Sequence, residues 1–184
     1  MTSPAPYRPS ETFLTPRYML RRCGPDDAEA IFASYSADPE VTRFLGWTPH
    51  RDAAETRAFL ACVASEWDEA AGFPAVVVAR AAPRKTLGMF HPRVMGSRIS
   101  YGYVLARRAW GRGCASEILS ALVQHALSHP AIFRTEAFCD TRNRASARVM
   151  EKAGMVHEGV LRRYFIHPNL AAEPTDCLLY ARTR

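Results

Sequence analysis

A glycine-containing turn at residues 110–115 constrains the fold more than any other stretch of this 184-residue chain. Its letters are Trp-Gly-Arg-Gly-Cys-Ala, with an extended run over 99–105 before it and an amphipathic segment over 116–128 after it. A strand, a glycine turn and a helix in this order point several backbone N–H groups, and the positive end of a helix dipole, at one spot. Gly111 and Gly113 let the backbone approach a ligand without an intervening Cβ. The sequence therefore predicts an anion site, of the kind that most often binds phosphate.

Length and composition indicate one soluble globular domain. A chain of 184 residues that is 48% hydrophobic and 23% charged is long enough for one core and short for two. No run approaches the roughly 20 apolar residues that a membrane-spanning helix needs. The first residues also lack a charged-then-apolar signal segment. We therefore expect a cytoplasmic protein that does not contact a membrane.

The cysteines and histidines indicate neither a metal centre nor a disulfide framework. The five cysteines form no C-x-x-C pair, and the six histidines show no metal-ligand spacing with supporting ligands. Cys114, at the start of a helical segment, is a candidate nucleophile. A buried or incidental thiol is the simpler interpretation.

The formal net charge of +6 favours an anionic partner. Arg107, Arg108 and Arg112 flank the glycine turn, and a second basic group lies within 142–148. Basic residues interleaved with aromatic ones, as in many nucleic-acid-binding proteins, are not found here. A phosphorylated cofactor is therefore the expected partner, and nucleic acid is a weaker hypothesis.

Apolar periodicity predicts a single mixed α/β domain over residues 17–184, after an irregular lead-in over 1–16 that carries four prolines. Helices are expected over 25–35, 38–45, 52–70, 116–128 and 143–153, the second of them short. Strands are expected over 18–22, 74–80, 86–90, 99–105, 135–139, 155–165 and 175–182. Residues 91–98 would form an insert between two strands.

Three motifs in a fixed order carry a family resemblance. They are the glycine turn, Asn143-Arg-Ala-Ser146 with the segment 149–159 that follows it, and the early segment Pro39–Trp47. The chain resembles the GNAT superfamily of acetyl-CoA-dependent N-acetyltransferases from about residue 17 to 182. It is most similar to the RimJ/RimL-like branch, the ribosomal-protein N-terminal acetyltransferases. The resemblance implies a central mixed, mostly antiparallel sheet of about six to seven strands, flanked by about four helices, with splayed strands at the acetyl-CoA cleft.

The superfamily signature (Gln or Arg, two residues, Gly, one residue, Gly or Ala) fits this chain in two registers. One begins at Arg108 and matches literally, and the other begins at Trp110 and departs at its first position. We prefer the second, because Trp-Gly-Lys/Arg-Gly before Ala-Ser/Thr-Glu is typical of this branch. The resemblance then implies that the CoA pyrophosphate is held by the backbone N–H groups of Trp110, Gly111, Arg112, Gly113, Cys114 and Ala115. It also implies backbone pairing of the pantetheine arm with Tyr103, Val104 and Leu105.

Acetyl transfer from a thioester to an amine requires a proton for the departing thiolate and a donor for the developing oxyanion. A backbone N–H near Leu105 suits the second. Many relatives protonate the thiolate with a tyrosine seven positions after the asparagine, where this chain has Met150. The branch has a serine three positions after the asparagine, present here as Ser146. The resemblance therefore implies Ser146 as proton donor or sulfur ligand, and Asn143 as a ligand of the cofactor arm.

The sequence leaves the general base open. The carboxylates that relatives use are replaced here by Ser100 and Tyr101 on one strand and by Phe165 on another; water, Tyr164 or His167 are the alternatives. An α-amine of pKa about 7.7–8.0 is roughly 10–20% neutral at pH 7, whereas lysine is less than about 0.1% neutral. A weak base therefore favours an α-amine acceptor.

The leading hypothesis is acetyl transfer by direct attack of a protein or peptide N-terminus on acetyl-CoA. A small-molecule amine (polyamine, amino-acid derivative or antibiotic) and a catalytically weak acyl-CoA-binding module are the alternatives. Trp47, Tyr101 and Tyr164 are expected to contact the acceptor, and the 91–98 insert to edge its cleft. A homodimer is compatible with the sequence, which does not fix the acceptor.

Overall fold

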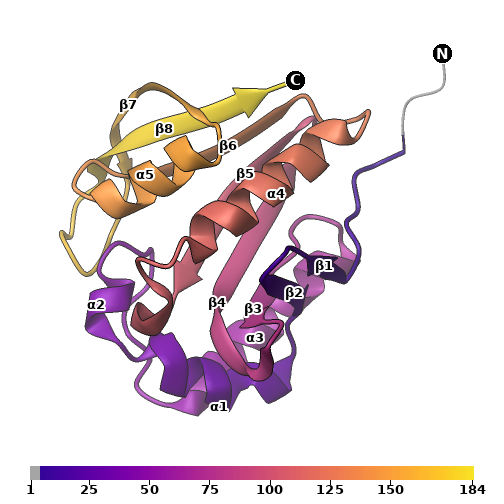
Figure 1. Ribbon diagram of the computed structural model, residues 1–184. Helices are drawn as coiled ribbons and strands as arrows, with labels where there is room; N and C mark the ends of the chain where they lie inside the picture. Colours follow the sequence, from indigo (N-terminus) through magenta and orange to yellow (C-terminus); the bar gives the residue numbers. More distant parts are fainter. Residues whose placement is uncertain (1–4) are drawn as a thin grey trace.

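An eight-stranded sheet with the order β1-β2-β3-β4-β5-β6-β8-β7 runs through the computed structural model, which describes residues 5–184 (Figure 1). Its strands are β1 (Thr12–Leu14), β2 (Tyr18–Arg22), β3 (Ala75–Ala79), β4 (Ala82–Met95), β5 (Arg98–Leu105), β6 (Arg134–Asp140), β7 (Val156–Phe165) and β8 (Thr175–Thr183). The α-helices are α1 (Ala28–Ile31), α2 (Pro39–Thr42), α3 (Ala53–Asp68), α4 (Cys114–Ser128) and α5 (Arg144–Lys152). The central β5–β6 pair is parallel, and the other neighbouring strands pair antiparallel.

Helices cover both faces of the sheet. In β3, Val76 and Val78 belong to the core shared with α1 and α3, whereas Val77 belongs to the core shared with α4 and α5. This alternation is the period of two that a strand imposes on its side chains. Burial on both faces explains why β3 is a continuous apolar run rather than an alternating one.

The expected fold class is confirmed, with eight strands instead of six to seven and five α-helices instead of about four. The expectation of an irregular segment over 1–16 is wrong for Thr12–Leu14, which forms β1 and pairs with β2; residues 1–4 lie outside the described part. Tyr7 is also buried in the core. A strand of three residues is too short to show an alternating pattern, so the sequence could not reveal β1.

The expected 91–98 insert is also wrong. Strand β4 continues to Met95, and β5 begins at Arg98 after the two-residue turn Gly96-Ser97. The residues are thus the tip of a β-hairpin. Pro92 concealed it, because proline is unusual inside a strand. Here its carbonyl oxygen accepts a hydrogen bond from Phe73 N at 2.8 Å.

Two helix boundaries bear on the site. Helix α4 begins at Cys114, two residues before the predicted start, so Cys114 and Ala115 form its first turn. Helix α5 begins after its N-cap Asn143 and ends before Gly154, as predicted. In the part of the chain that the structure describes, no helix is long and apolar enough to cross a membrane.

Candidate functional site

Strands β5 and β6 separate after a short contact, and two cavities occupy the opening. Residues 98–100 of β5 pair with 134–136 of β6. A cavity of about 490 Å³, here called the turn cavity, is lined by the glycine turn, the end of β5 and the first turns of α5. A cavity of about 400 Å³, here called the aromatic cavity, is lined by β4, β5, the segment 44–47 and the 165–167 region. Both are lined by Tyr103, Val104, Asn143 and Ser146, so they meet there.

The glycine turn directs backbone N–H groups into the turn cavity. Gly111 has φ +70° and Gly113 has φ +73°, which residues with a side chain rarely adopt. Gly113 is the N-cap of α4 and provides no side-chain acceptor. The N–H groups of Cys114, Ala115 and Ser116 begin the helix and so have no intrahelical acceptor. All three residues line the cavity, which gives the geometry of an anion site.

Glu117 anchors the turn to the N-terminal part of the chain. Its carboxylate accepts hydrogen bonds from Thr15 Oγ1 at 2.7 Å, from Arg17 N at 3.0 Å and from Arg17 Nε at 2.6 Å. Arg17 Nη1 also donates to the carbonyl oxygen of Arg112 at 3.1 Å. Partial burial acts to raise the pKa of Glu117, but the bonds from Thr15 and Arg17 hold it below its usual value. Glu117 is therefore a charged anchor for the turn.

Of the basic residues that the sequence suggested, Arg148 lines the turn cavity, whereas Arg107 and Arg108 do not. Arg107 Nε pairs with Asp38 Oδ2 at 2.6 Å, and Arg108 Nη2 donates to Ser34 Oγ at 2.7 Å and to the carbonyl oxygen of Thr86. Both side chains are thus engaged by other segments. The basic residues lining the cavity are Arg43, Arg148 and Lys152, accompanied by one acid, Glu40. Trp110 lines the turn cavity, and Arg108 does not.

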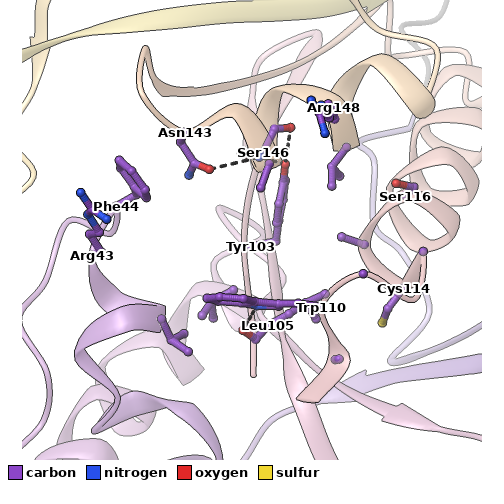
Figure 2. A pocket seen from close by; sticks show the side chains of 18 of the residues that line it. Arg43, Phe44, Tyr103, Leu105, Trp110, Cys114, Ser116, Asn143, Ser146 and Arg148 are labelled. Atoms are coloured by element: carbon purple, nitrogen blue, oxygen red, sulfur yellow. Dashed lines mark hydrogen bonds between the residues drawn. The ribbon is translucent and has the colours of Figure 1, made fainter. Parts of the chain in front are cut away.

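The other residues predicted to bind the cofactor line the turn cavity, except Arg112. Arg112 contributes a carbonyl oxygen to the Arg17 contact instead. Trp110 is 45% exposed, and its indole Nε1 donates to the carbonyl oxygen of Leu105 at 2.7 Å (Figure 2). This bond fixes the turn against the end of β5.

Ser146, Tyr103 and Asn143 form a hydrogen-bonded group where the two cavities meet (Figure 2). Ser146 Oγ lies 2.7 Å from Tyr103 Oη, and either hydroxyl can be the donor. Asn143 Oδ1 accepts from Ser146 N at 3.1 Å and so caps α5. Burial raises the pKa of Tyr103 well above its usual value, so the phenol keeps its proton. Tyr103 contributes a side-chain hydroxyl that the sequence analysis, which assigned it only a backbone role, missed.

Two further residues have no role in proton transfer or nucleophilic attack. Met150 is fully buried and packs in the core. Cys114 is 1% exposed, and burial raises the pKa of its thiol to about 11. A nucleophilic cysteine needs a thiolate at working pH, so the structure argues against a covalent route through Cys114.

Aromatic rings make up much of the aromatic cavity. Trp47 lines it as predicted, with its ring centroid 4.8 Å from that of His50 and 6.4 Å from that of Phe59. Phe138 and Phe165 form a second pair, with centroids 5.3 Å apart. These rings form an apolar lining with His and Arg side chains interspersed.

Tyr101 lines the aromatic cavity although its hydroxyl is bonded in the core, whereas Tyr164 does not line the cavity. Tyr101 is 4% exposed, and its hydroxyl donates to the carbonyl oxygen of Leu122 at 3.1 Å, in the core beneath α4. Tyr164 is 51% exposed, is not part of the lining and packs edge-on against Phe138. Because side chains alternate along a strand, Phe165 lines the cavity in place of Tyr164.

A charged row on β4 also escaped the sequence analysis. Arg93 Nη2 lies 2.9 Å from His91 Nδ1, and His91 Nε2 lies 2.6 Å from Glu66 Oε2. Since a guanidinium can only donate, His91 accepts at Nδ1 and donates from Nε2 to Glu66. Burial and the Arg93 charge lower the pKa of His91 against the opposing effect of Glu66. Residues two positions apart in a strand share a face of the sheet. Recognition of this segment as a strand would therefore have placed His91 and Arg93 on the same face.

A second polar row joins His167, Thr175 and Asp140 at the end of β6. His167 was one of several open candidates for the base, but nothing in the sequence linked it to Asp140. The two residues are 27 positions apart in the sequence and meet only in the folded sheet. Across residues 5–184, no group of three or more His, Cys, Asp or Glu side chains is arranged to hold a metal ion.

Comparison with known proteins agrees with this geometry. Residues 17–156 match the family described as "Acetyltransferase (GNAT) domain". The chain is 33% identical to the uncharacterized N-acetyltransferase YoaA of Bacillus subtilis (strain 168), over 82% of this chain and 85% of the relative. In fold it is similar to the microcin C7 self-immunity acetyltransferase MccE, solved with acetyl-CoA and AMP, with a TM-score of 0.82 at 15% identity over 92% of this chain and 94% of that one. It is also similar to RimL, a ribosomal L7/L12 α-N-protein acetyltransferase solved with coenzyme A, with a TM-score of 0.79 at 19% identity over 92% and 95% of the two chains.

The family match covers more than half of the chain, and the glycine turn, the splayed strands and the Asn143–Ser146 motif lie together as the resemblance implied. The chain belongs to the GNAT acetyltransferase family.

Proposed function

We propose that this protein transfers an acetyl group from acetyl-CoA to the α-amine of a peptide or protein N-terminus by direct attack of the amine. The observation that carries the acceptor assignment is the charge of the aromatic cavity. Among the described residues that line it, none is Asp or Glu, whereas His50, His91, His167 and Arg93 are present.

The turn cavity suits the acetyl donor. Acetyl-CoA carries a pyrophosphate and a further phosphate, and the N-terminus of α4 together with Arg43, Arg148 and Lys152 provides favourable interactions for these anions. The edge of β5 that has left β6 offers unpaired backbone groups to the amides of the pantetheine arm. The arm would thereby reach Ser146, where the two cavities meet.

Ser146 and Tyr103 suit the departure of CoA. The thiolate needs a proton when the C–S bond breaks, and the Ser146 hydroxyl lies at the junction of the cavities. Its 2.7 Å bond to the Tyr103 hydroxyl allows the phenol to replace the proton that Ser146 gives up. Met150 leaves no tyrosine at the position that many relatives use, so Ser146 takes that role.

The lining of the aromatic cavity, which among the described residues has Arg93 and no carboxylate, disfavours polycationic acceptors. A polyamine or an aminoglycoside carries several charges that carboxylates would have to balance, and the lining supplies none. Without a carboxylate base, the amine must also lose its proton easily. An α-amine of pKa about 7.7–8.0 meets this condition better than lysine at about 10.4.

Thiol release from acetyl-CoA tests the proposal with three acceptors at pH 7. They are a lysine-free hexapeptide that begins with a free serine, an Nα-acetylated hexapeptide that carries one lysine, and spermidine. We expect the free α-amine to be acetylated roughly 100-fold faster than the lysine, in line with the neutral fractions of the two amines. Faster acetylation of lysine or spermidine would contradict the acceptor assignment. Acetyl-CoA binding without turnover on any of the amines would indicate an acyl-CoA-binding module instead.

A further inference from the structure

A buried polar row, formed by Asp140, Thr175 and His167, borders the aromatic cavity. It takes no part in donor binding or in protonation of the departing thiolate. Asp140 ends β6, Thr175 begins β8, and His167 lies in the connection between β7 and β8. Thr175 Oγ1 lies 2.7 Å from Asp140 Oδ2 and 2.9 Å from His167 Nδ1. Asp140 is fully buried and His167 is 2% exposed. Burying a carboxylate and an imidazole is costly unless each is well paired, so this arrangement calls for an explanation.

The hydrogen bonds fix where the protons lie. The Thr175 hydroxyl has one proton, and its acceptors are the Asp140 carboxylate at 2.7 Å and the carbonyl oxygen of Phe165 at 3.4 Å. The shorter bond to the charged group takes the proton. Thr175 Oγ1 therefore accepts from His167 Nδ1–H. In its neutral form, His167 therefore carries its proton on Nδ1 and its lone pair on Nε2.

The Nε2 atom of His167 is not fully buried. Within the described residues it has no hydrogen-bond partner, yet every fully buried side-chain nitrogen or oxygen there has one. Nε2 must therefore be among the atoms that reach open space, and His167 lines the aromatic cavity. The lone pair of a positioned imidazole is thereby presented to an acceptor bound in that cavity.

Burial keeps His167 neutral at pH 7. Burial lowers its pKa, with Arg142 adding to this effect and Asp140 opposing it. Arg142 binds the Asp140 carboxylate through N at 2.9 Å, Nε at 2.8 Å and Nη2 at 2.9 Å, and holds the pKa of Asp140 well below its usual value. Asp140 thus stays ionised and orients Thr175, which in turn orients the imidazole. The Phe165 ring packs edge-on against His167 with centroids 5.1 Å apart. The other titratable or charged groups lining the cavity are His50, His91, Arg93, Cys139 and the tyrosines Tyr35, Tyr101 and Tyr103.

We propose that His167 is the general base of the acetyl transfer, oriented by Thr175 and Asp140 as positioning residues. The acceptor enters as a neutral amine after losing one proton to solvent. Its nitrogen forms the C–N bond with the thioester carbonyl carbon, and His167 Nε2 takes one N–H proton. The C–S bond then breaks, and the thiolate takes the proton of Ser146. The imidazolium proton returns through water to restore the Ser146–Tyr103 pair. This inference rests on the proposed function, because it assigns a residue to that same reaction.

Variants at two positions separate catalysis from structure. His167→Asn keeps a side-chain N–H where Nδ1 stands, so it can still donate to Thr175, but it removes Nε2. His157→Asn is the matched control, because His157 is an exposed histidine on β7 that lines neither cavity. Thr175→Val removes the hydroxyl that holds the imidazole, whereas Thr175→Ser keeps it.

The pH dependence of kcat/KM for the serine-initiated hexapeptide, expressed per concentration of its neutral amine form so that ionisation of the acceptor is removed, tests the assignment. The wild-type rate should fall as pH decreases through the pKa of His167, below about 6.5, because the base becomes protonated. At pH 7 we expect His167→Asn to lower kcat/KM for the peptide about 100-fold and to abolish this acid limb, with the KM for acetyl-CoA unchanged. Thr175→Val should lower kcat/KM for the peptide about tenfold and shift the pH of the acid limb. Thr175→Ser should restore the wild-type kcat/KM and the wild-type position of the limb.

A measurement that does not depend on turnover completes the test. The imidazole ¹³Cε1 signal that disappears in His167→Asn should titrate in the wild-type protein at the same pH as the acid limb, and its position should shift in Thr175→Val. An acid limb that persists in His167→Asn, or equal loss of activity in His157→Asn, would overturn the role of His167. Absence of wild-type turnover with all three acceptors would overturn the proposed function itself, which is a different outcome.

Discussion

The turn cavity and the aromatic cavity meet at Tyr103, Val104, Asn143 and Ser146, yet they are built in different ways. The turn cavity presents backbone groups: a glycine turn, the N-terminus of α4 and the free edge of β5. The aromatic cavity presents side chains from segments spread between Ile31 and His167. One site therefore combines a half that depends on main-chain geometry with a half that depends on which side chains line it.

This difference in construction determines which ligand each cavity can recognise. Backbone N–H groups bind any ligand with the right anion at the right place, so the turn cavity is suited to one constant donor. Side chains can be exchanged without altering the fold, so the aromatic cavity is free to differ between members of a family. We therefore expect changes in the turn cavity to alter donor binding, and changes in the aromatic cavity to alter the acceptor or the chemical step.

A large effect on kcat should come from Ser146, at the junction of the two cavities. Ser146→Ala should lower kcat at least tenfold with little change in the affinity for acetyl-CoA, since the departing thiolate loses its proton donor. Stopped-flow or steady-state thiol release with the hexapeptide measures kcat, and calorimetry measures acetyl-CoA binding. Tyr103→Phe serves as the companion variant, because it removes the hydroxyl 2.7 Å from Ser146 Oγ and leaves the serine in place. An unchanged kcat in Ser146→Ala would remove this residue from the mechanism.

A smaller effect, confined to donor binding, should come from the turn. Gly111→Ala places a Cβ on a residue with φ +70°, which costs an L-residue about 1–2 kcal/mol unless the turn changes shape. Because the turn directs the N–H groups of α4, we expect the KM for acetyl-CoA to rise roughly tenfold, with kcat and the KM for the peptide nearly unchanged.

Gly96→Ala is the matched control for backbone strain. Gly96 has φ +66° in the β4–β5 hairpin turn, and an added Cβ would meet no atom within 4 Å, as at Gly111. Both variants should lose similar stability in urea unfolding, but only Gly111→Ala should weaken acetyl-CoA binding. Equal weakening in both would mean that strain, rather than the local direction of N–H groups, explains the result.

The same contrast explains which parts of the site could be predicted from sequence. The glycine turn, the helix that follows it and the Asn143 cap are local, because each depends on residues within a few positions of one another. The sequence therefore located the turn cavity correctly. Two of its expected cations were misassigned: Arg107 and Arg108 are close in sequence to the turn but bind Asp38, Ser34 and the Thr86 carbonyl oxygen.

The lining of the aromatic cavity could not be predicted from local sequence, because its residues come together only through the pairing of strands in the sheet. Tyr101 and Tyr164 were expected to contact the acceptor. Tyr101 lines the cavity with its hydroxyl bonded in the core, whereas Tyr164 is half exposed and lies outside the lining. Arg93 was hidden in a segment that looked like an insert, since Pro92 interrupted the strand pattern. The Asp140–Thr175–His167 row depends on the register Asp140↔Cys177 between β6 and β8, which no local pattern specifies.

The smallest expected effect concerns stability, and it again distinguishes the two halves. The pKa values of His91 and His167 are lowered mainly by burial, so the unfolded chain binds more protons than the folded protein as pH falls through about 6.5. The free energy of unfolding should therefore rise between pH 5 and pH 7, by at most about 1.4 kcal/mol per pH unit for each histidine. Carboxylates such as Asp140 and Glu117 also have lowered pKa values, but their contribution to stability is lost only at lower pH.

Urea unfolding between pH 5 and pH 7 measures how steeply the free energy of unfolding depends on pH. This slope should decrease in His167→Asn and stay unchanged in Gly111→Ala, because the histidines with lowered pKa values line the aromatic cavity and not the glycine turn. A slope that is flat or negative in the wild-type protein would contradict the lowered pKa values of these two imidazoles.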